Sequence, residues 1–259
     1  MAGQPAPPLL VLWRLPHQPP VGADRRSLRP GVRTEGVSQI QQKANPNEVN
    51  RTVAEVITHP DYKGQTNEND IALLKLSSPV AFTAYIAPVC LAASGSTFYD
   101  GVDCWVTGWG NIAFGVLPYP QNLQEVKVPI VGNRQCQCNY GQYKISEDMV
   151  CAGLKQGGKD ACQLDSGGPL VSKQGSRWIQ AGLVSFGEGC ALPNFPGVYT
   201  RVSQYQTWIN SQITSDQPGF ITFSSTGTNS DLSVSGGHQA RFPLCLCLLL
   251  LFLVFPKFS

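Results

Sequence analysis

Residues 160–169 read DACQLDSGGP, and they are the most specific stretch of the sequence. Ser166 lies there in a tight, glycine-rich turn, which can expose the hydroxyl and hold it rigidly. An acyl-transfer nucleophile requires both properties. A Ser-Gly-Gly sequence alone would more simply form an ordinary β-turn. The interpretation therefore depends on the motifs that surround this turn.

Three further motifs accompany the turn. They read NDIALLKL at residues 69–76, CWVTGWG at residues 104–110 and PGVYTRV at residues 196–202. Together the four motifs resemble, in order, the trypsin/chymotrypsin family of serine peptidases. The end of the chain is similar to the membrane-tethered, tryptase- and prostasin-like branch. The resemblance implies two six-stranded β-barrels followed by a C-terminal helix.

The composition and the residue pattern favour the same all-β class independently. The chain has 259 residues, of which 42% are hydrophobic and only 14% are charged, with 26 Gly and 20 Pro. From about Gly36 to Ile213, short apolar stretches alternate with turn residues, which predicts many short strands. Residues 202–213 have apolar side chains at helical spacing, which predicts an amphipathic helix. The net charge of +2 does not suggest a nucleic-acid partner.

The resemblance implies a role for each residue of the catalytic centre. Ser166 matches the nucleophile, and Asp70 matches the carboxylate that orients and stabilises the catalytic imidazole. Asp165 matches the acid that pairs, in active members, with the new N-terminal amine after zymogen cleavage. The implied activity is endopeptidase hydrolysis, and the implied partners are protein or peptide substrates and serine protease inhibitors.

The resemblance also implies a pocket for the substrate. Asp160 matches the floor of the primary specificity pocket, where a carboxylate favours Arg or Lys before the cleaved bond. Ser185 begins the segment that pairs with the substrate backbone. Gly187 and Gly197 match pocket-wall positions, where a side chain would block entry.

The catalytic histidine of the family has no counterpart. Its place falls near residues 24–26, which read Asp24-Arg25-Arg26. The chain has three histidines, and His59 matches a non-catalytic surface segment of the family, while His17 and His238 lie in the head and the tail. Loss of any one of the three catalytic residues (the serine, the histidine or the aspartate) leaves only a small part of the catalytic rate. We therefore expect this chain to have little or no turnover.

Two more departures concern the oxyanion hole and the front of the chain. Leu164 stands where the family has a glycine whose N–H forms half of the oxyanion hole, and a lost donor there costs about 3–4 kcal/mol. The activation cleavage site and several first-barrel strands also have no counterpart. The resemblance then implies an incomplete first barrel and a zymogen-like, loosely ordered pocket.

The chain divides into four expected regions. Residues 1–35 read as a disordered Pro/Arg-rich head, without a credible secretion signal. Residues 36–214 are the partial peptidase domain, and residues 215–241 read as a solvated Ser/Thr-rich stalk. Residues 242–259 form a hydrophobic tail that resembles a GPI-attachment signal, with Ser230 or Ser233 favoured for attachment. A short anchor or an artefact of the reading frame is the alternative.

The nine cysteines suggest an oxidising, extracellular setting. By resemblance, Cys162 pairs with Cys190, and one of Cys136 and Cys138 pairs with Cys151. In the family, the cysteine that pairs with Cys104 lies at the position of Ser172. Whichever of Cys136 and Cys138 does not pair with Cys151 is then the candidate partner of Cys104. Cys90 matches the cysteine that tethers the propeptide of the family.

Two functional interpretations remain. The first is a truncated trypsin-like endopeptidase tethered at the cell surface, and the second is a non-catalytic homologue that acts as an extracellular binding module. Asn50 begins an N-glycosylation sequon that is consistent with both. We expect no cofactor and no metal site, because no His/Cys cluster with ligand spacing is free of disulfide roles.

Overall fold

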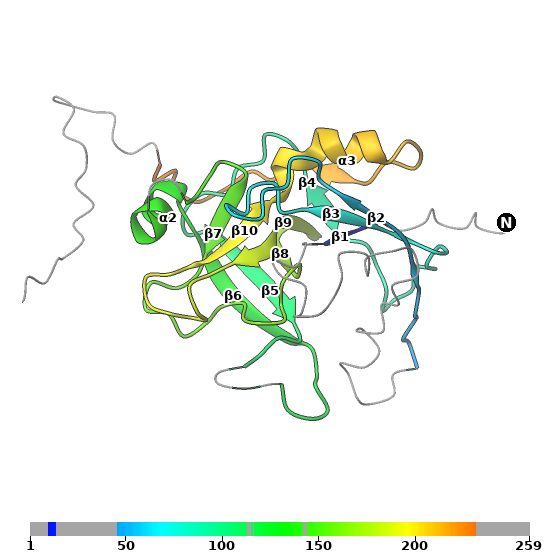
Figure 1. Ribbon diagram of the computed structural model, residues 1–259, viewed down its shortest axis with the longest axis horizontal. Coiled ribbons are helices and arrows are strands. Elements are labelled where there is room, and N and C mark those ends of the chain that lie inside the picture. The colour runs from blue at the N-terminus through cyan, green and yellow to red at the C-terminus, as the bar shows by residue number, and fades with distance from the viewer. Residues whose placement is uncertain (1–9, 14–45, 113–114, 116, 142–143, 232–259) are drawn as a thin grey trace, which may run out of the picture.

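The computed structural model describes residues 10–13, 46–112, 115, 117–141 and 144–231. It is built mainly from β-strands (Figure 1). The strands are β1 (Leu10–Trp13), β2 (Val53–Thr58), β3 (Ala72–Leu76), β4 (Cys90–Ala92), β5 (Asp103–Gly108), β6 (Gln124–Val131), β7 (Met149–Ala152), β8 (Pro169–Gln174), β9 (Arg177–Phe186), β10 (Gly197–Arg201) and β11 (Phe220–Ile221). The helices are α2 (Asn133–Tyr140), the 3-10 turn η2 (Val202–Tyr205) and α3 (Gln206–Gln212).

Six strands close into a barrel. They follow the order β10-β7-β6-β5-β8-β9, and β9 pairs back with β10. Alternate residues of each strand face the interior, because successive side chains of a strand point to opposite sides. On β6, for example, Val128 and Ile130 are buried, while Lys127 forms an exposed ion pair with Asp103 of β5. The expected barrel of the all-β fold is therefore present.

The strands of the first barrel form a smaller, open sheet in the described part of the chain. Its order is β1-β3-β2, and all pairs are antiparallel. Ile71 and Leu73 from this sheet pack with Leu183 of the closed barrel and Ile209 of α3. The helix therefore lies where the two sheets meet. The expected incomplete first barrel agrees with this arrangement.

The head differs from our expectation at one place. Residues 1–35 read as disordered, yet Leu10–Trp13 forms β1, which pairs along β3 from Leu10 opposite Lys75 to Trp13 opposite Ala72. The short apolar run is therefore a strand, since β3 offers it a free edge. The rest of the head lies outside the described residues.

The C-terminal helix is shorter than its apolar pattern predicts. The segment from Val202 begins as the 3-10 turn η2, and α3 follows from Gln206 to Gln212. Val202, Tyr205 and Ile209 are buried, as the amphipathic pattern requires. The predicted helix is confirmed with a tighter first turn.

The segment after the helix does not form a stalk within the described residues. Residues 219–231, here called the C-terminal strap, lie along the closed barrel. Phe220–Ile221 form β11, which pairs in parallel with β4. Phe223 is buried and stacks on Phe98, with ring centroids 4.6 Å apart. The Ser/Thr-rich composition is explained by hydrogen bonds, because Ser225 accepts one from the N–H of Tyr99.

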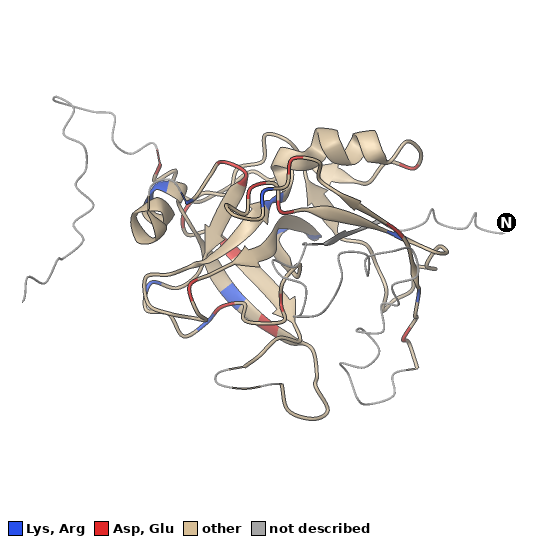
Figure 2. Ribbon diagram, in the orientation of Figure 1, with Lys and Arg blue, Asp and Glu red and all other residues tan. Residues whose placement is uncertain are grey.

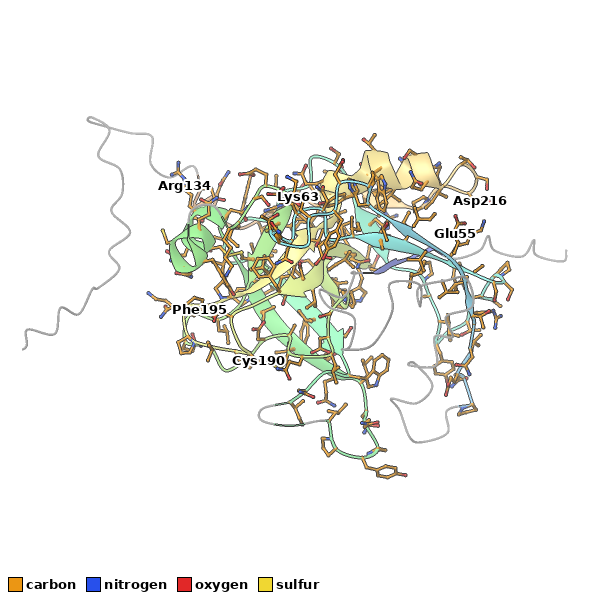
Figure 3. The ribbon with its side chains drawn as sticks, viewed as in Figure 1. Glu55, Lys63, Arg134, Cys190, Phe195 and Asp216 are labelled. Carbon is orange, nitrogen blue, oxygen red and sulfur yellow. A yellow bond between two sulfur atoms is a disulfide. The ribbon has the colours of Figure 1, made fainter. Side chains whose placement is uncertain are left out.

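The C-terminal strap ends at α2. The Asp231 carboxylate accepts hydrogen bonds from the N–H groups of Asn133 and Arg134, at 3.2 and 2.9 Å. It thereby caps a helix that has no side-chain cap of its own. Asp216 and Arg134, labelled in Figure 3, mark the two ends of the body between which the C-terminal strap runs.

Within the described residues, no helix combines the length and apolar character needed to cross a membrane. The hydrophobic tail at residues 242–259 lies outside them. Figure 2 shows that Lys/Arg and Asp/Glu are interspersed along the described chain.

Candidate active site

Ser166 lies at the tip of a turn that hydrogen bonds fix on both sides. The N–H of Asp165 donates to Cys162 O at 3.0 Å, and the N–H of Gly168 donates to Asp165 O at 2.8 Å. Gly167, at φ +82°, donates to Val184 O of β9. A left-handed residue is needed there, and glycine adopts that conformation without steric cost. The turn thus presents Ser166 as an exposed side chain on a rigid base.

A large groove passes Ser166. It has a volume of about 1050 Å³ and lies between the open sheet and the closed barrel, with Leu73, Lys75, Leu123 and Gln180 among its lining. Peptide-sized ligands fit such a groove, because pockets for drug-sized ligands measure about 300–1,000 Å³.

Asp70, two residues before β3, connects the open sheet to the closed barrel. Its side chain is fully buried, and Oδ2 accepts a hydrogen bond from Ser185 Oγ at 2.7 Å. Its carbonyl oxygen accepts another from Thr200 Oγ1 at 2.8 Å. Hydrogen bonds to the charged form stabilise a buried carboxylate. The structure therefore brings Asp70 and Ser185 together and gives Ser185 a contact that the sequence did not reveal.

Asp148 positions Asn69, the residue before Asp70. The sequence analysis did not identify this role of Asp148. Its carboxylate accepts hydrogen bonds from the N–H of Asn69 at 2.8 Å and from the hydroxyl of Tyr205 at 3.0 Å. Burial, followed by the charge of Asp148, raises the pKa of Tyr205, so this hydroxyl stays a donor. Asp148 thus ties the backbone just before Asp70 to η2, because it accepts hydrogen bonds from both Asn69 and Tyr205.

Asp160 lies in a partly buried site, six residues before Ser166 in the sequence. Its Oδ2 accepts a hydrogen bond from the N–H of Ala191 at 3.1 Å. Its Oδ1 is buried without a hydrogen-bond partner, and so is the hydroxyl of Tyr199. Burial raises the pKa of Asp160 to about 6, against the lowering effect of its backbone hydrogen bonds. Two unsatisfied buried oxygens in one site suit a ligand that brings hydrogen-bond donors.

The two glycines predicted for the pocket wall differ in their surroundings. A Cβ on Gly197 would lie 2.7 Å from Asp160 Oδ1 and 3.1 Å from the Tyr199 hydroxyl, so any side chain there would fill the site. A Cβ on Gly187 would meet only Gly189 O and the Tyr140 hydroxyl, at 3.8 and 3.9 Å. A side chain is therefore tolerated less well at position 197 than at position 187.

Known families account for this geometry. A family model described as Trypsin matches residues 30–209. The chain belongs to the trypsin family. It is 49% identical over 174 residues to a mouse protein described as "Tryptase", a match that covers 64% of this chain and 63% of that protein. The chain thus spans about 63% of the length of this trypsin-family relative.

Leu164 has an unusual backbone conformation for its place in a trypsin-family fold. Its φ is +76°, in the left-handed region, and its side chain is 77% exposed. The chain keeps the conformation of a glycine while carrying a branched side chain, which costs about 1–2 kcal/mol. The isobutyl group lines the groove next to Ser166.

His59 does not serve as a catalytic base in the described geometry. Its ring lies 5.4 Å from that of Tyr205 and 4.9 Å from that of Trp208, and its Nδ1 accepts a hydrogen bond from the N–H of Asp61. Burial lowers the pKa of His59, so the ring is neutral at physiological pH. Its contacts are therefore those of a packing residue. His17 and His238 lie outside the described residues.

The disulfide pattern agrees with the trypsin family in two bonds. The structure joins Cys162 to Cys190, which is labelled in Figure 3, and Cys136 to Cys151. The first bond connects the segment before Ser166 to the segment whose Ala191 N–H donates to Asp160.

Cys104 differs from our expectation. We expected it to pair with Cys136 or Cys138, but it is a free, buried thiol that is hydrogen-bonded to Ser172. Cys136 is taken by Cys151, and Cys138 is disulfide-bonded as well. Burial raises the pKa of Cys104 to about 12, so the thiol stays protonated. Cys90 is also a free thiol in the described part of the chain.

Proposed function

We propose that this chain binds peptides through an Arg or Lys side chain held by Asp160, with little or no hydrolysis at Ser166. The unsatisfied Asp160 Oδ1, next to the unsatisfied Tyr199 hydroxyl, carries the proposal. A guanidinium offers five N–H donors and a full charge, so it can satisfy both oxygens. The groove past Ser166 would take the flanking peptide.

The poor turnover follows from the residues around Ser166. A serine hydroxyl is a weak nucleophile at its own pKa and needs an adjacent general base. The only histidine in the described residues, His59, packs against Tyr205 and Trp208. Asp24, Arg25 and Arg26 occupy the stretch where the family has its histidine. We therefore propose that acyl transfer at Ser166 is slow.

A fluorophosphonate probe tests the catalytic part of this proposal. We expect no covalent labelling of Ser166 and no cleavage of Arg or Lys peptide substrates above the level of Ser166→Ala. Intact-protein mass spectrometry and a fluorogenic substrate measure the two outcomes. Stoichiometric labelling together with cleavage after Arg would show an active trypsin-like endopeptidase, which is the alternative function.

A binding role outside the cell is the wider setting of this proposal. Two disulfides and the exposed Asn50 support it, because disulfides persist in oxidising compartments and glycosylation requires an exposed sequon. The tail at residues 242–259 would supply a GPI-type lipid anchor, and serine protease inhibitors are candidate partners. Glycosidase-sensitive mass at Asn50 and release from cells by a phosphatidylinositol-specific phospholipase test these points, with Asn50→Gln as the control for glycosylation.

A further inference from the structure

The groove past Ser166 has one wall that lies beyond the part of the chain matched by the family. The family model ends at residue 209, whereas residues 213–219, which follow α3, also line the groove. Residues 213–218, here called the C-terminal linker, join α3 to the C-terminal strap. The groove therefore extends from the nucleophile turn of the trypsin-family body to a segment that the family model does not include.

Hydrogen bonds fix the C-terminal linker at both of its ends. After α3, the N–H of Ile213 donates to Ile209 O at 3.1 Å, and the side-chain amide of Gln217 donates to Ile213 O. At the other end, the N–H of Leu91 donates to Gly219 O at 2.9 Å, just before β11 pairs with β4. A wall whose backbone is already ordered loses little conformational entropy when a ligand binds against it.

Exposed apolar side chains gather in this groove. In the described part of the chain ten large apolar side chains are exposed, and four of them line the groove. These four are Phe82, Val89, Leu123 and Leu164, and the exposed fractions of their surfaces are 47%, 36%, 48% and 77%. A contiguous exposed apolar patch marks a binding surface, because a ligand that covers it removes apolar area from water. The groove therefore suits a ligand with apolar side chains.

The charged residues of the groove disfavour acidic ligands. Glu55 of β2 lies opposite Lys75 of β3, with 3.9 Å between Oε2 and Nζ, so these two charges largely offset each other. The other charged residues of the described lining, Asp165 and Asp216, are both acidic. Figure 3 shows Glu55 and Asp216 on the same side of the molecule. An acidic ligand side chain would therefore meet like charges, which cost binding free energy.

We infer that the groove binds an extended peptide whose Arg or Lys enters the Asp160 site and whose apolar side chains lie between the trypsin-family body and the C-terminal linker. The inference rests on the proposed function, and it names both the peptide class and the segment that selects it. Six extended residues span about 20 Å, so such a ligand reaches well beyond the single side chain held by Asp160. The C-terminal linker thereby makes the strand pairing of the C-terminal strap part of ligand recognition.

The first test compares three peptides with blocked ends on the full chain by isothermal titration calorimetry. They are Arg-Leu-Ser-Leu-Ser-Leu, the same peptide with every Leu replaced by Ser, and the same peptide with every Leu replaced by Glu, each also in reversed order. In one of the two orders the leucine peptide should bind at least about tenfold more tightly than the serine peptide, because burial of one leucine side chain supplies that factor. The glutamate peptide should bind no better than the serine peptide. Equal affinities for the leucine and serine peptides in both orders would overturn the inference.

The second test places a long, charged side chain on the C-terminal linker. Ser215 is exposed and lines the groove, so Ser215→Arg should weaken binding of the leucine peptide at least about tenfold. The same variant should leave binding of p-aminobenzamidine, a small fluorescent amidinium probe for the Asp160 site, within about twofold of wild type. Ser176→Arg is the matched control, because Ser176 is exposed in the turn between β8 and β9 and does not line the groove. Wild-type affinity of Ser215→Arg for the leucine peptide would contradict a role for the C-terminal linker.

Failure of the proposed function has a different signature. If wild type and Asp160→Asn fail equally to bind p-aminobenzamidine, the Asp160 site does not hold a cation and both proposals are wrong. If wild type binds the probe and Asp160→Asn does not, the Asp160 site stands and the peptide comparison decides the inference. The comparison of leucine and serine peptides on wild type decides it also if Ser215→Arg does not fold.

Discussion

Single residues set the chemistry of this site, and Leu164 shows how. A leucine in the left-handed region is strained, because its Cβ crowds the following carbonyl oxygen. The exposed side chain recovers little packing energy in exchange. The strain is local to the groove wall beside Ser166, where the trypsin family has a glycine.

Replacing Leu164 by glycine should therefore stabilise the protein. We expect Leu164→Gly to raise the free energy of unfolding by about 0.5–1 kcal/mol, because relief of the left-handed strain exceeds the extra entropy of the unfolded chain. Urea denaturation measures the change. Leu123→Gly is the control, since Leu123 is 48% exposed, against 77% for Leu164, and has no positive φ; this variant should destabilise the protein. A loss of stability in both variants would contradict the argument.

Asp160 should make ligand binding depend on pH. A cation binds the ionised carboxylate, and burial raises the pKa of Asp160 to about 6. Affinity for p-aminobenzamidine should be constant at about pH 8 and should fall as the pH drops through about 6, approaching roughly tenfold per pH unit. Fluorescence titrations across this range measure it. Asp160→Asn should bind weakly at every pH, and a flat wild-type profile would rule out this linkage.

The sequence indicated Asp70, Ser166 and Asp160 as candidate site residues, because residue type and neighbouring motifs single them out, but it did not indicate their contacts. The hydrogen bond from Ser185 to Asp70 and the role of Asp148 depend on segments more than 75 residues apart meeting in space. No local pattern encodes such a meeting.

At the scale of elements, the C-terminal strap changes the boundary of the domain. The family model ends at residue 209, and the Ser/Thr-rich composition after the helix suggested a stalk. The structure instead shows parallel pairing of β11 with β4 and a buried Phe223. Composition misled because a serine of the strap bonds to the backbone of the barrel domain, as in the hydrogen bond from Tyr99 N–H to Ser225 Oγ.

Phe223 should be a major source of stability for this strap. Phe223→Ala removes a buried ring stacked on Phe98, so we expect a loss of about 3–4 kcal/mol in the free energy of unfolding. Chemical denaturation followed by tryptophan fluorescence measures it. Phe82→Ala changes the same side chain at a half-exposed position and should cost less than about 1 kcal/mol. Equal losses in the two variants would show that the strap contributes no specific packing.

β5 and β8 offer a second test at the level of elements. In the antiparallel register of β5 and β8, Trp105 lies opposite Val171, which puts Cys104 opposite Ser172, so their backbones are close enough for a disulfide. We expect Ser172→Cys to form one with Cys104 and to raise stability by about 2–4 kcal/mol. Thiol titration of the denatured protein should find one thiol fewer than in Ser172→Ala. One thiol more than in Ser172→Ala would mean that the bond does not form.

The whole molecule combines a closed sheet with an open one. Every strand of the closed barrel has two neighbours, while β2 lies at the edge of its sheet, and one of its sides has no strand partner among the residues that the structure describes. The resemblance to the trypsin family predicted this asymmetry, because several first-barrel strands have no counterpart in the sequence. They could not predict β1, since a four-residue apolar run becomes a strand only when a partner edge is available.

Hydrogen exchange should separate the two sheets. Amides of β6 should exchange at least about tenfold more slowly than amides of β2, because opening a closed barrel requires breaking two ladders while an edge strand frays alone. Exchange measured by mass spectrometry on peptides covering residues 124–131 and 53–58 reports the two strands. Equal rates would indicate that the two sheets open as one unit.

The C-terminal strap also determines how a recombinant form should be cut. A version ended at residue 214, just after the helix, would uncover the edge of β4 and the face of Phe98 that Phe223 covers. An open strand edge beside an exposed aromatic ring pairs readily with another copy, so such a product should self-associate. It would also leave the first amides of α2 without the Asp231 carboxylate. Soluble expression therefore calls for an end point beyond Asp231, outside the limits of the family match.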